Sequence, residues 1–187
     1  MKKTLGICAI ALLVGLVIPL TSYAQKTANH KVKLNLGESA LIAITTGDID
    51  LNLAGATSAG AAIATEASND ITRIRISSSV STDKTRKLDV GIKTGDIIDG
   101  GSSISVLAYT PAGFSGASSG YGHPLDAVEL DGVTKTTGTL INAIGTCWSG
   151  TETDSGYQIK YTLNKPAGAT FTNGLQVTII YTLSNEI

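Results

Sequence analysis

Few residues of this 187-residue chain have the types and spacing that catalysis requires. Gly116-Ala117-Ser118-Ser119-Gly120 matches the G-x-S-x-G pattern of serine hydrolases, and His123 follows closely. The pattern works when a strand precedes the serine and a helix follows it, because the sharp turn exposes the hydroxyl and the helix start donates to the oxyanion. Here the pattern lies in a stretch rich in Gly and Ser, without those elements. We therefore predict no catalytic residues and no enzymatic activity.

Metal binding has a weak basis. Beyond residue 25 the imidazole and thiol groups are those of His30, His123 and Cys147. They are far apart and lack the paired spacing of zinc sites. Hard cations such as calcium need several oxygen ligands, which sandwich rims often supply. The weak calcium candidates are Asp48, Asp50, Asp96 and Asp99. Aspartate also forms turns readily, and no known calcium-binding loop is present, so we predict no cofactor.

Sugar binding would need exposed aromatic side chains. Trp148 is the only tryptophan, and Tyr121 and Tyr157 are its potential neighbours. Tyr157 and Tyr161 share the alternation of the apolar residues around them, which predicts that both lie in the core. Trp148 stands at a strand end or turn, where a buried and an exposed position fit equally well. Tyr121 and Trp148 are therefore candidate ligand contacts.

The first residues are typical of an export signal. Met1-Lys2-Lys3 precedes an apolar run from Leu5 to Leu20, and Ser22 and Ala24 are the small residues of a cleavage site. A retained membrane anchor is the alternative, but a run of about 16 residues is short for a spanning helix. We expect residues 1–24 to be a signal peptide and 25–187 to be the mature domain, with no membrane span after cleavage. The protein would be secreted to the periplasm, the cell surface or the medium.

The charges argue against nucleic acid as a partner. The chain has 14 Lys and Arg against 15 Asp and Glu, and loss of Lys2 and Lys3 would leave 12 basic residues and a net charge of −3. No basic stripe is present. Cleavage would also remove Cys8, so Cys147 could form no internal disulfide. We expect Cys147 to be a small buried hydrophobic residue.

Alternation of apolar and polar residues dominates the chain beyond residue 30, as expected for strands with one buried face. The alternating runs are 31–36, 48–53, 73–76, 87–92, 157–163 and 175–183. Gly, Ser, Asn, Asp and Pro separate them, and Asp131-Gly132 is a candidate tight hairpin turn. No stretch has a convincing helical stripe. The sequence predicts an all-β fold, a single antiparallel β-sandwich of Ig-like or Greek-key type with about eight to ten strands.

Three stretches near the end, 144–150 (IGTCWSG), 156–163 (GYQIKYTL) and 177–184 (VTIIYTLS), resemble uncharacterised secreted envelope proteins of Gram-negative bacteria. That resemblance implies export and the fold more than a function. The layout of the mature chain, from an alternating first strand to a last strand rich in Val, Thr and Tyr, is similar to fimbrial subunits of chaperone-usher type. The disulfide common in several such families cannot form here. A fainter likeness is to cell-wall-binding domains, whose Trp-x-Leu motif is replaced by Tyr181-Thr182-Leu183.

We therefore expect a secreted, non-enzymatic structural or adhesive protein of the cell surface, a fimbrial-like subunit that assembles by strand complementation. In such assembly, an incomplete sandwich takes a strand from a partner and gains ladder hydrogen bonds and alternating side-chain contacts. Val32, Leu34 and Leu36 form the candidate donor strand, and 175–183 would be one wall of the accepting site. The partners would be further copies or other envelope subunits.

Two alternatives remain open. Residues 31–36 could pair within their own sandwich, which would make the protein a secreted monomer. The protein could also be a secreted glycan- or peptide-binding module, with Trp148 and the loop 110–124 as its contact surface.

Overall fold

The computed structural model describes residues 31–34, 37–109, 115–116, 120–170 and 172–186. The chain divides into two units, Met1–Asn35 and Leu36–Ile187. The expected signal peptide, His30, Leu36 and Ser118 lie outside the described residues. Within the described part, no residue is helical, and no helix long and apolar enough to cross a membrane is found.

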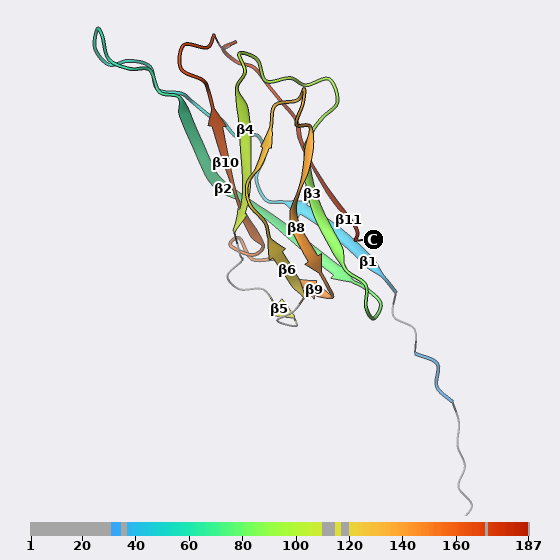
Figure 1. The fold of residues 1–187 in the computed structure, drawn as a ribbon. Helices are drawn as coiled ribbons and strands as arrows, with labels where there is room; N and C mark the ends of the chain where they lie inside the picture. Colours follow the sequence, from blue (N-terminus) through green and yellow to red (C-terminus); the bar gives the residue numbers. More distant parts are fainter. Residues whose placement is uncertain (1–30, 35–36, 110–114, 117–119, 171, 187) are drawn as a thin grey trace, which may run out of the picture. The chain divides into compact units, whose positions relative to one another are not determined.

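Two antiparallel sheets make up the second unit (Figure 1). The strands are β1 (Ser39–Ile44), β2 (Glu66–Ser79), β3 (Arg86–Ile92), β4 (Ser103–Tyr109), β5 (Ser115–Gly116), β6 (Tyr121–Pro124), β7 (Val128–Leu130), β8 (Thr137–Ile144), β9 (Cys147–Trp148), β10 (Tyr157–Asn164) and β11 (Ile179–Asn185). Sheet A has the order β5-β9-β2-β10-β4-β7, and β1 also pairs with β2. Sheet B has the order β11-β3-β8-β6. The predicted all-β, sandwich-like fold is confirmed. The described residues form eleven strands rather than eight to ten, because β5 and β9 are two-residue strands that no sequence pattern marks.

The core lies between the sheets, since buried residues of both sheets form one hydrophobic cluster. β10 shows how the sequence produces it: its odd-numbered side chains are buried and its even-numbered ones half-buried. β3 and β4 alternate in the same way, with their even-numbered side chains buried. Successive side chains of a strand point to opposite faces. The predicted core positions of Tyr157 and Tyr161 are confirmed, and Cys147 is buried as predicted.

Two alternating runs form less strand than predicted. Residues 48–53 are in no strand, although Ile49, Leu51 and Leu53 are half-buried and pack on the core. The last strand begins at Ile179 rather than at Leu175. Alternation indicates which side chains face the core, but strand formation also needs a backbone partner, and residues 48–53 and 175–177 pair with no other strand.

The predicted hairpin at Asp131-Gly132 is wrong. β7 pairs with β4 and β8 pairs with β3 and β6, so the two segments that flank the turn do not pair with each other. The Asp131 carboxylate instead accepts hydrogen bonds from the backbone N–H groups of Val133, Thr134 and Lys135 at 2.7, 2.8 and 2.9 Å. These bonds hold a wider turn than a two-residue hairpin. The hydroxyl of Thr134 lowers the pKa of Asp131 most, and the backbone N–H groups lower it further.

Candidate functional site

The inner face of β1 is not covered by sheet B. In the antiparallel pair of β1 and β2, Ile42 lies opposite Ile76 and Ile44 opposite Ile74. Residues directly opposite each other project to the same face, so Ile42 and Ile44 face the interior. Ile74 is 0% exposed, whereas Ile44 is 47% exposed and Ile42 only half-buried. Sheet B therefore lacks a strand at the place where it would cover β1.

The neighbouring segments are incompletely buried in the same way. β1 and β11 contact each other, so sheets A and B end on the same side of the core. Elsewhere the inward side chains of β3, β4 and β10 are buried. We call the incompletely buried side, including the outer edge of β11, the uncovered flank. Its apolar side chains are Ile42, Ile44, Ile49, Leu51, Leu53, Leu175, Val177, Ile179, Tyr181 and Leu183.

The edge of β11 has unpaired backbone groups. Lys93 N donates to Thr178 O, and Glu186 N donates to Thr85 O, both at 2.9 Å. In an antiparallel ladder the hydrogen-bonded residues alternate with those that point away. The even-numbered residues of β11 therefore bond to β3, and the N–H and C=O groups of its odd-numbered residues point outward. Among the described strands, β3 is the only partner of β11, so this edge can accept another strand.

A row of hydroxyl groups joins the two sheets at the uncovered flank. The hydroxyls of Tyr161 and Tyr181 lie 2.6 Å apart, and those of Thr46 and Thr72 lie 2.8 Å apart. The two pairs are neighbours, because Thr72 also influences the pKa of Tyr161. Burial raises the pKa of both tyrosines. Each pair uses one of its two hydroxyl hydrogens within the pair, so each pair has one hydrogen available to an acceptor outside it.

The candidate donor segment is exposed where the structure describes it. Residues 31–34 are in no strand, and Val32 and Leu34 are 67% and 88% exposed. The third candidate, Leu36, lies outside the described residues. Two apolar side chains at alternate positions are thus available for contact.

The calcium candidates divide into two pairs. Asp96 accepts a hydrogen bond from Thr178 N at 2.7 Å, and Asp99 accepts one from Thr172 N at 3.1 Å. These carboxylates fasten the turn before β4 to the segment that leads into β11. Asp48 and Asp50 are exposed, and neither side chain makes a hydrogen bond or ion pair with a described residue. Across the described residues, no three His, Cys, Asp or Glu side chains gather closely enough to hold a metal ion.

The two candidate ligand-contact residues lie on different surfaces. Trp148 pairs with Ser77 on the outer face of sheet A and is 51% exposed. Tyr121 lies opposite the fully buried Ile144 in sheet B, so its side chain packs against the core. The structure does not bring them together as one aromatic platform. Cys147, next to Trp148, faces inward, and burial raises the pKa of its thiol to about 11.

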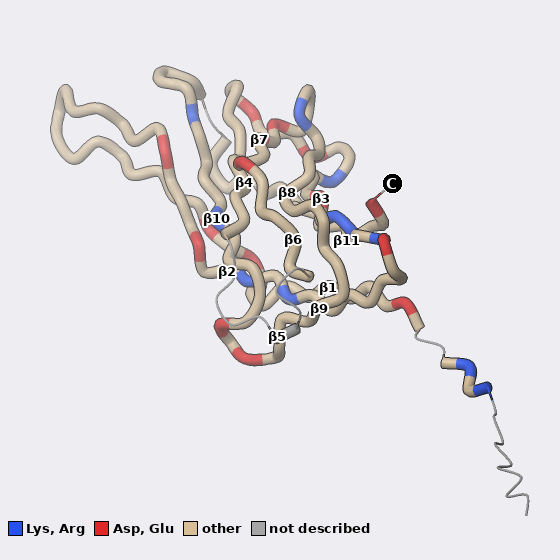
Figure 2. The backbone as a smooth tube through the Cα atoms, turned by 60° about the horizontal axis from the view of Figure 1, so that its bottom comes forward, with Lys and Arg blue, Asp and Glu red and all other residues tan. Residues whose placement is uncertain are grey.

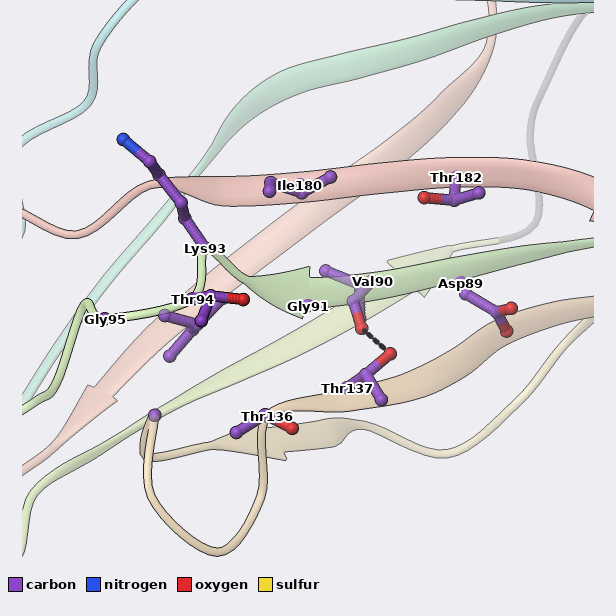
Figure 3. Close-up of a pocket in the computed structure, with 12 residues that line it drawn as sticks. Asp89, Val90, Gly91, Lys93, Thr94, Gly95, Thr136, Thr137, Ile180 and Thr182 are labelled. Carbon is purple, nitrogen blue, oxygen red and sulfur yellow. Dashed lines mark hydrogen bonds between the residues drawn. The ribbon is translucent and has the colours of Figure 1, made fainter.

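A hollow of about 480 Å³ lies over β3, β8 and β11 (Figure 3). Gly91 contributes no side chain there, and a Cβ on it would lie 2.9 Å from the carbonyl oxygen of Thr136. The only carboxylate in its lining, Asp89, already contacts Thr139 Oγ1 at 2.6 Å and Lys87 Nζ at 3.0 Å. The described lining residues include no nucleophile next to a base, so the hollow suggests no catalytic chemistry.

Sequence reasoning placed one wall of the uncovered flank at 175–183 and missed the other. The missed wall comprises β1, whose signal is the uninterrupted apolar run Ala40-Leu41-Ile42-Ala43-Ile44. Thr46 and Thr72 have no sequence signal, because only the fold brings them to Tyr161. Acidic and basic residues are interspersed along the described chain (Figure 2).

No protein-family model, curated protein or solved structure matches this chain.

Proposed function

We propose that this protein is a non-enzymatic structural subunit, exported to the cell surface, that assembles by strand complementation. A strand from a partner would pair with the outer edge of β11 and cover the inner face of β1. Its inward side chains would complete the burial of the uncovered flank. The observation that carries the proposal is the exposure of Ile44, which faces the interior of the sandwich yet has no cover.

The outer edge of β11 and the candidate donor segment repeat at the same two-residue spacing. The outward backbone groups of β11 belong to Ile179, Tyr181 and Leu183, spaced two residues apart. Val32, Leu34 and Leu36 have the same spacing. An extended segment that pairs with this edge can therefore turn all three apolar side chains toward the core, and that register is favoured because the alternative would bury Lys31 and Lys33. Burial of one such side chain contributes about 1.5–3 kcal/mol. This hydrophobic contribution favours binding of the strand at the flank.

The test is the double variant Val32→Asp/Leu34→Asp of the exported protein. We expect the unchanged protein to form oligomers in size-exclusion chromatography and short filaments in negative-stain images. The double variant should remain monomeric with an unchanged circular dichroism spectrum, because carboxylates cannot enter the apolar flank without a large desolvation cost. Val133→Asp is the matched control, since Val133 is 65% exposed, like Val32, but lies on the turn between β7 and β8.

Two outcomes would contradict the proposal. An unchanged protein that stays monomeric at high concentration would show that the edge does not accept a partner. A double variant that loses its folded spectrum as a monomer would show that residues 31–36 belong to their own sandwich.

A second function, glycan or peptide binding, is favoured by one observation, the exposure of Trp148 on the outer face of sheet A. An exposed indole ring can stack on a sugar. Under this function, Trp148→Ala would weaken retention on a glycan column and leave assembly unchanged.

A further inference from the structure

The uncovered flank has charged residues beside its apolar ones. In the segment 48–53 the half-buried Ile49 and Leu51 alternate with exposed Asp48, Asp50 and Asn52. Neither aspartate side chain forms a hydrogen bond or ion pair with a described residue. By contrast, Asp96 and Asp99, near the other wall, both bind backbone amides. Two free carboxylates spaced two residues apart thus line one side of the flank.

The candidate donor has the complementary pattern. Exposed Lys31 and Lys33 alternate with Val32 and Leu34, again two residues apart. If the two apolar side chains face the core, both lysines point outward. Ile49 and Leu51 pack on the same core as the inward residues of β11, whereas Asp48 and Asp50 are exposed. A donor that buries its apolar side chains against this core exposes its lysines in the same way, which allows them to meet the aspartates.

The opposite wall offers the lysines no competing charge. The exposed residues that alternate with the inward ones along this wall are Gln176, Thr178, Ile180 and Thr182, all neutral. The charges on that face of β3 lie one strand further away, where Asp89 pairs with Lys87 at 3.0 Å and Lys93 lies opposite Thr178. We therefore assign charge selection to Asp48 and Asp50, the unpaired carboxylates of the flank. Opposite charges between facing strands stabilise pairing, and like charges directly opposite destabilise it.

We propose that the uncovered flank binds residues 31–34 of a second copy of this chain, and that Asp48 and Asp50 select that copy through Lys31 and Lys33. This inference rests on the proposed function and adds the identity of the partner. It makes the protein a self-assembling subunit whose donor and acceptor are matched by charge as well as by shape. The pairing is exposed, so salt weakens it.

The test is a charge swap in the full exported chain. Asp48→Lys/Asp50→Lys and Lys31→Glu/Lys33→Glu each place like charges opposite one another. Each double variant should assemble about tenfold more slowly than the unchanged protein at low salt. The quadruple variant restores opposite charges and should recover to within about threefold of the unchanged rate. In about 0.5 M NaCl the differences should largely disappear, because the screening length falls well below 8 Å.

Glu152→Lys/Asp154→Lys is the matched control. These two exposed acids have the same spacing but lie between β9 and β10, away from the flank, so their reversal should leave the assembly rate unchanged. Circular dichroism of every variant checks that it folds. Rates are followed by light scattering and the products by negative-stain imaging.

The outcomes separate the two proposals. Recovery in the quadruple variant supports charge selection. If Val32→Asp/Leu34→Asp abolishes assembly while the charge variants behave like the unchanged protein, or if the quadruple variant does not recover, charge selection is wrong and strand complementation stands. If the unchanged protein does not assemble, both are wrong.

Discussion

At the scale of single residues, the hydroxyl row formed by Thr46, Thr72, Tyr161 and Tyr181 is the most specific polar feature of the interior. It crosses from sheet A to sheet B at the side where the core is least covered. Thr72 is almost fully buried. Removing the partner of a buried hydroxyl lowers the free energy of unfolding, because water cannot replace the lost hydrogen bond.

We expect Tyr161→Phe to lower the free energy of unfolding by about 1–3 kcal/mol, since it leaves the Tyr181 hydroxyl without its partner. Urea unfolding, followed by circular dichroism, measures the change. Tyr109→Phe is the control, because Tyr109 is exposed at the end of β4 and its hydroxyl should contribute little. Equal midpoints for Tyr161→Phe and the unchanged protein would mean that the row does not stabilise the fold.

At the scale of elements, β11 differs on its two edges. Thr182 and Ile180 lie opposite β3 residues in the hydrogen-bonded positions, whereas Ile179, Tyr181 and Leu183 present their amides to the open edge. Every second backbone amide of β11 is therefore hydrogen-bonded to β3, and the amides between them are open to solvent.

Amide hydrogen exchange should reveal this alternation. In the monomer at low concentration, we expect slow exchange at Ile180 and Thr182 and exchange at least tenfold faster at Ile179, Tyr181 and Leu183, because only hydrogen-bonded amides are protected. On assembly the three fast amides should become slow. Two-dimensional NMR gives the rates residue by residue. Uniform protection along β11 in the monomer would mean that the edge is already paired.

The sequence pattern predicted the elements in part. Strict alternation identified β3, β10 and β11, whose inward faces are continuous. β1 was missed because apolar residues occupy both of its faces: Leu41 is exposed on the outside, and Ile44 is exposed on the inside for want of a covering strand. Residues 48–53 alternate because their apolar side chains pack on the core, which is why the sequence predicted a strand there. They form none because their backbone has no partner.

The candidate site was predictable to a similar extent. Alternation indicated the candidate donor segment and the 175–183 side of the flank. Asp48 and Asp50 were interpreted as weak calcium candidates. The spacing of two carboxylates does not by itself distinguish a cation site from a surface that binds the lysines of another strand. Only the burial of their neighbours, Ile49 and Leu51, relates them to the flank.

At the scale of the whole molecule, acidic protons buried in the core link stability to pH. Burial raises the pKa of the Cys147 thiol to about 11 from 9.0, and it raises the pKa of the Tyr157, Tyr161 and Tyr181 hydroxyls. The unfolded chain releases these protons at lower pH than the folded protein does. Above the unfolded pKa values the folded state therefore binds more protons, and the free energy of unfolding decreases as pH rises.

We expect a urea midpoint that falls steadily from about pH 9 to about pH 11, with no contribution from these groups below about pH 8. Circular dichroism at a series of pH values measures it. Cys147→Val removes the thiol, so its midpoint should fall less between about pH 9 and pH 10. A midpoint that stays constant to pH 10.5 would contradict the assigned burial of these groups.

The donor segment leads directly into β1, which begins at Ser39 and pairs with β2 over six consecutive positions. Glu38, just before β1, accepts a hydrogen bond from Ser81 and lies 3.8 Å from the Arg86 guanidinium. A pull along β1 would load all six pairs at once, in shear, rather than opening them one after another. In a filament held by these strands, mechanical tension would thus enter each subunit where the backbone ladder resists it best.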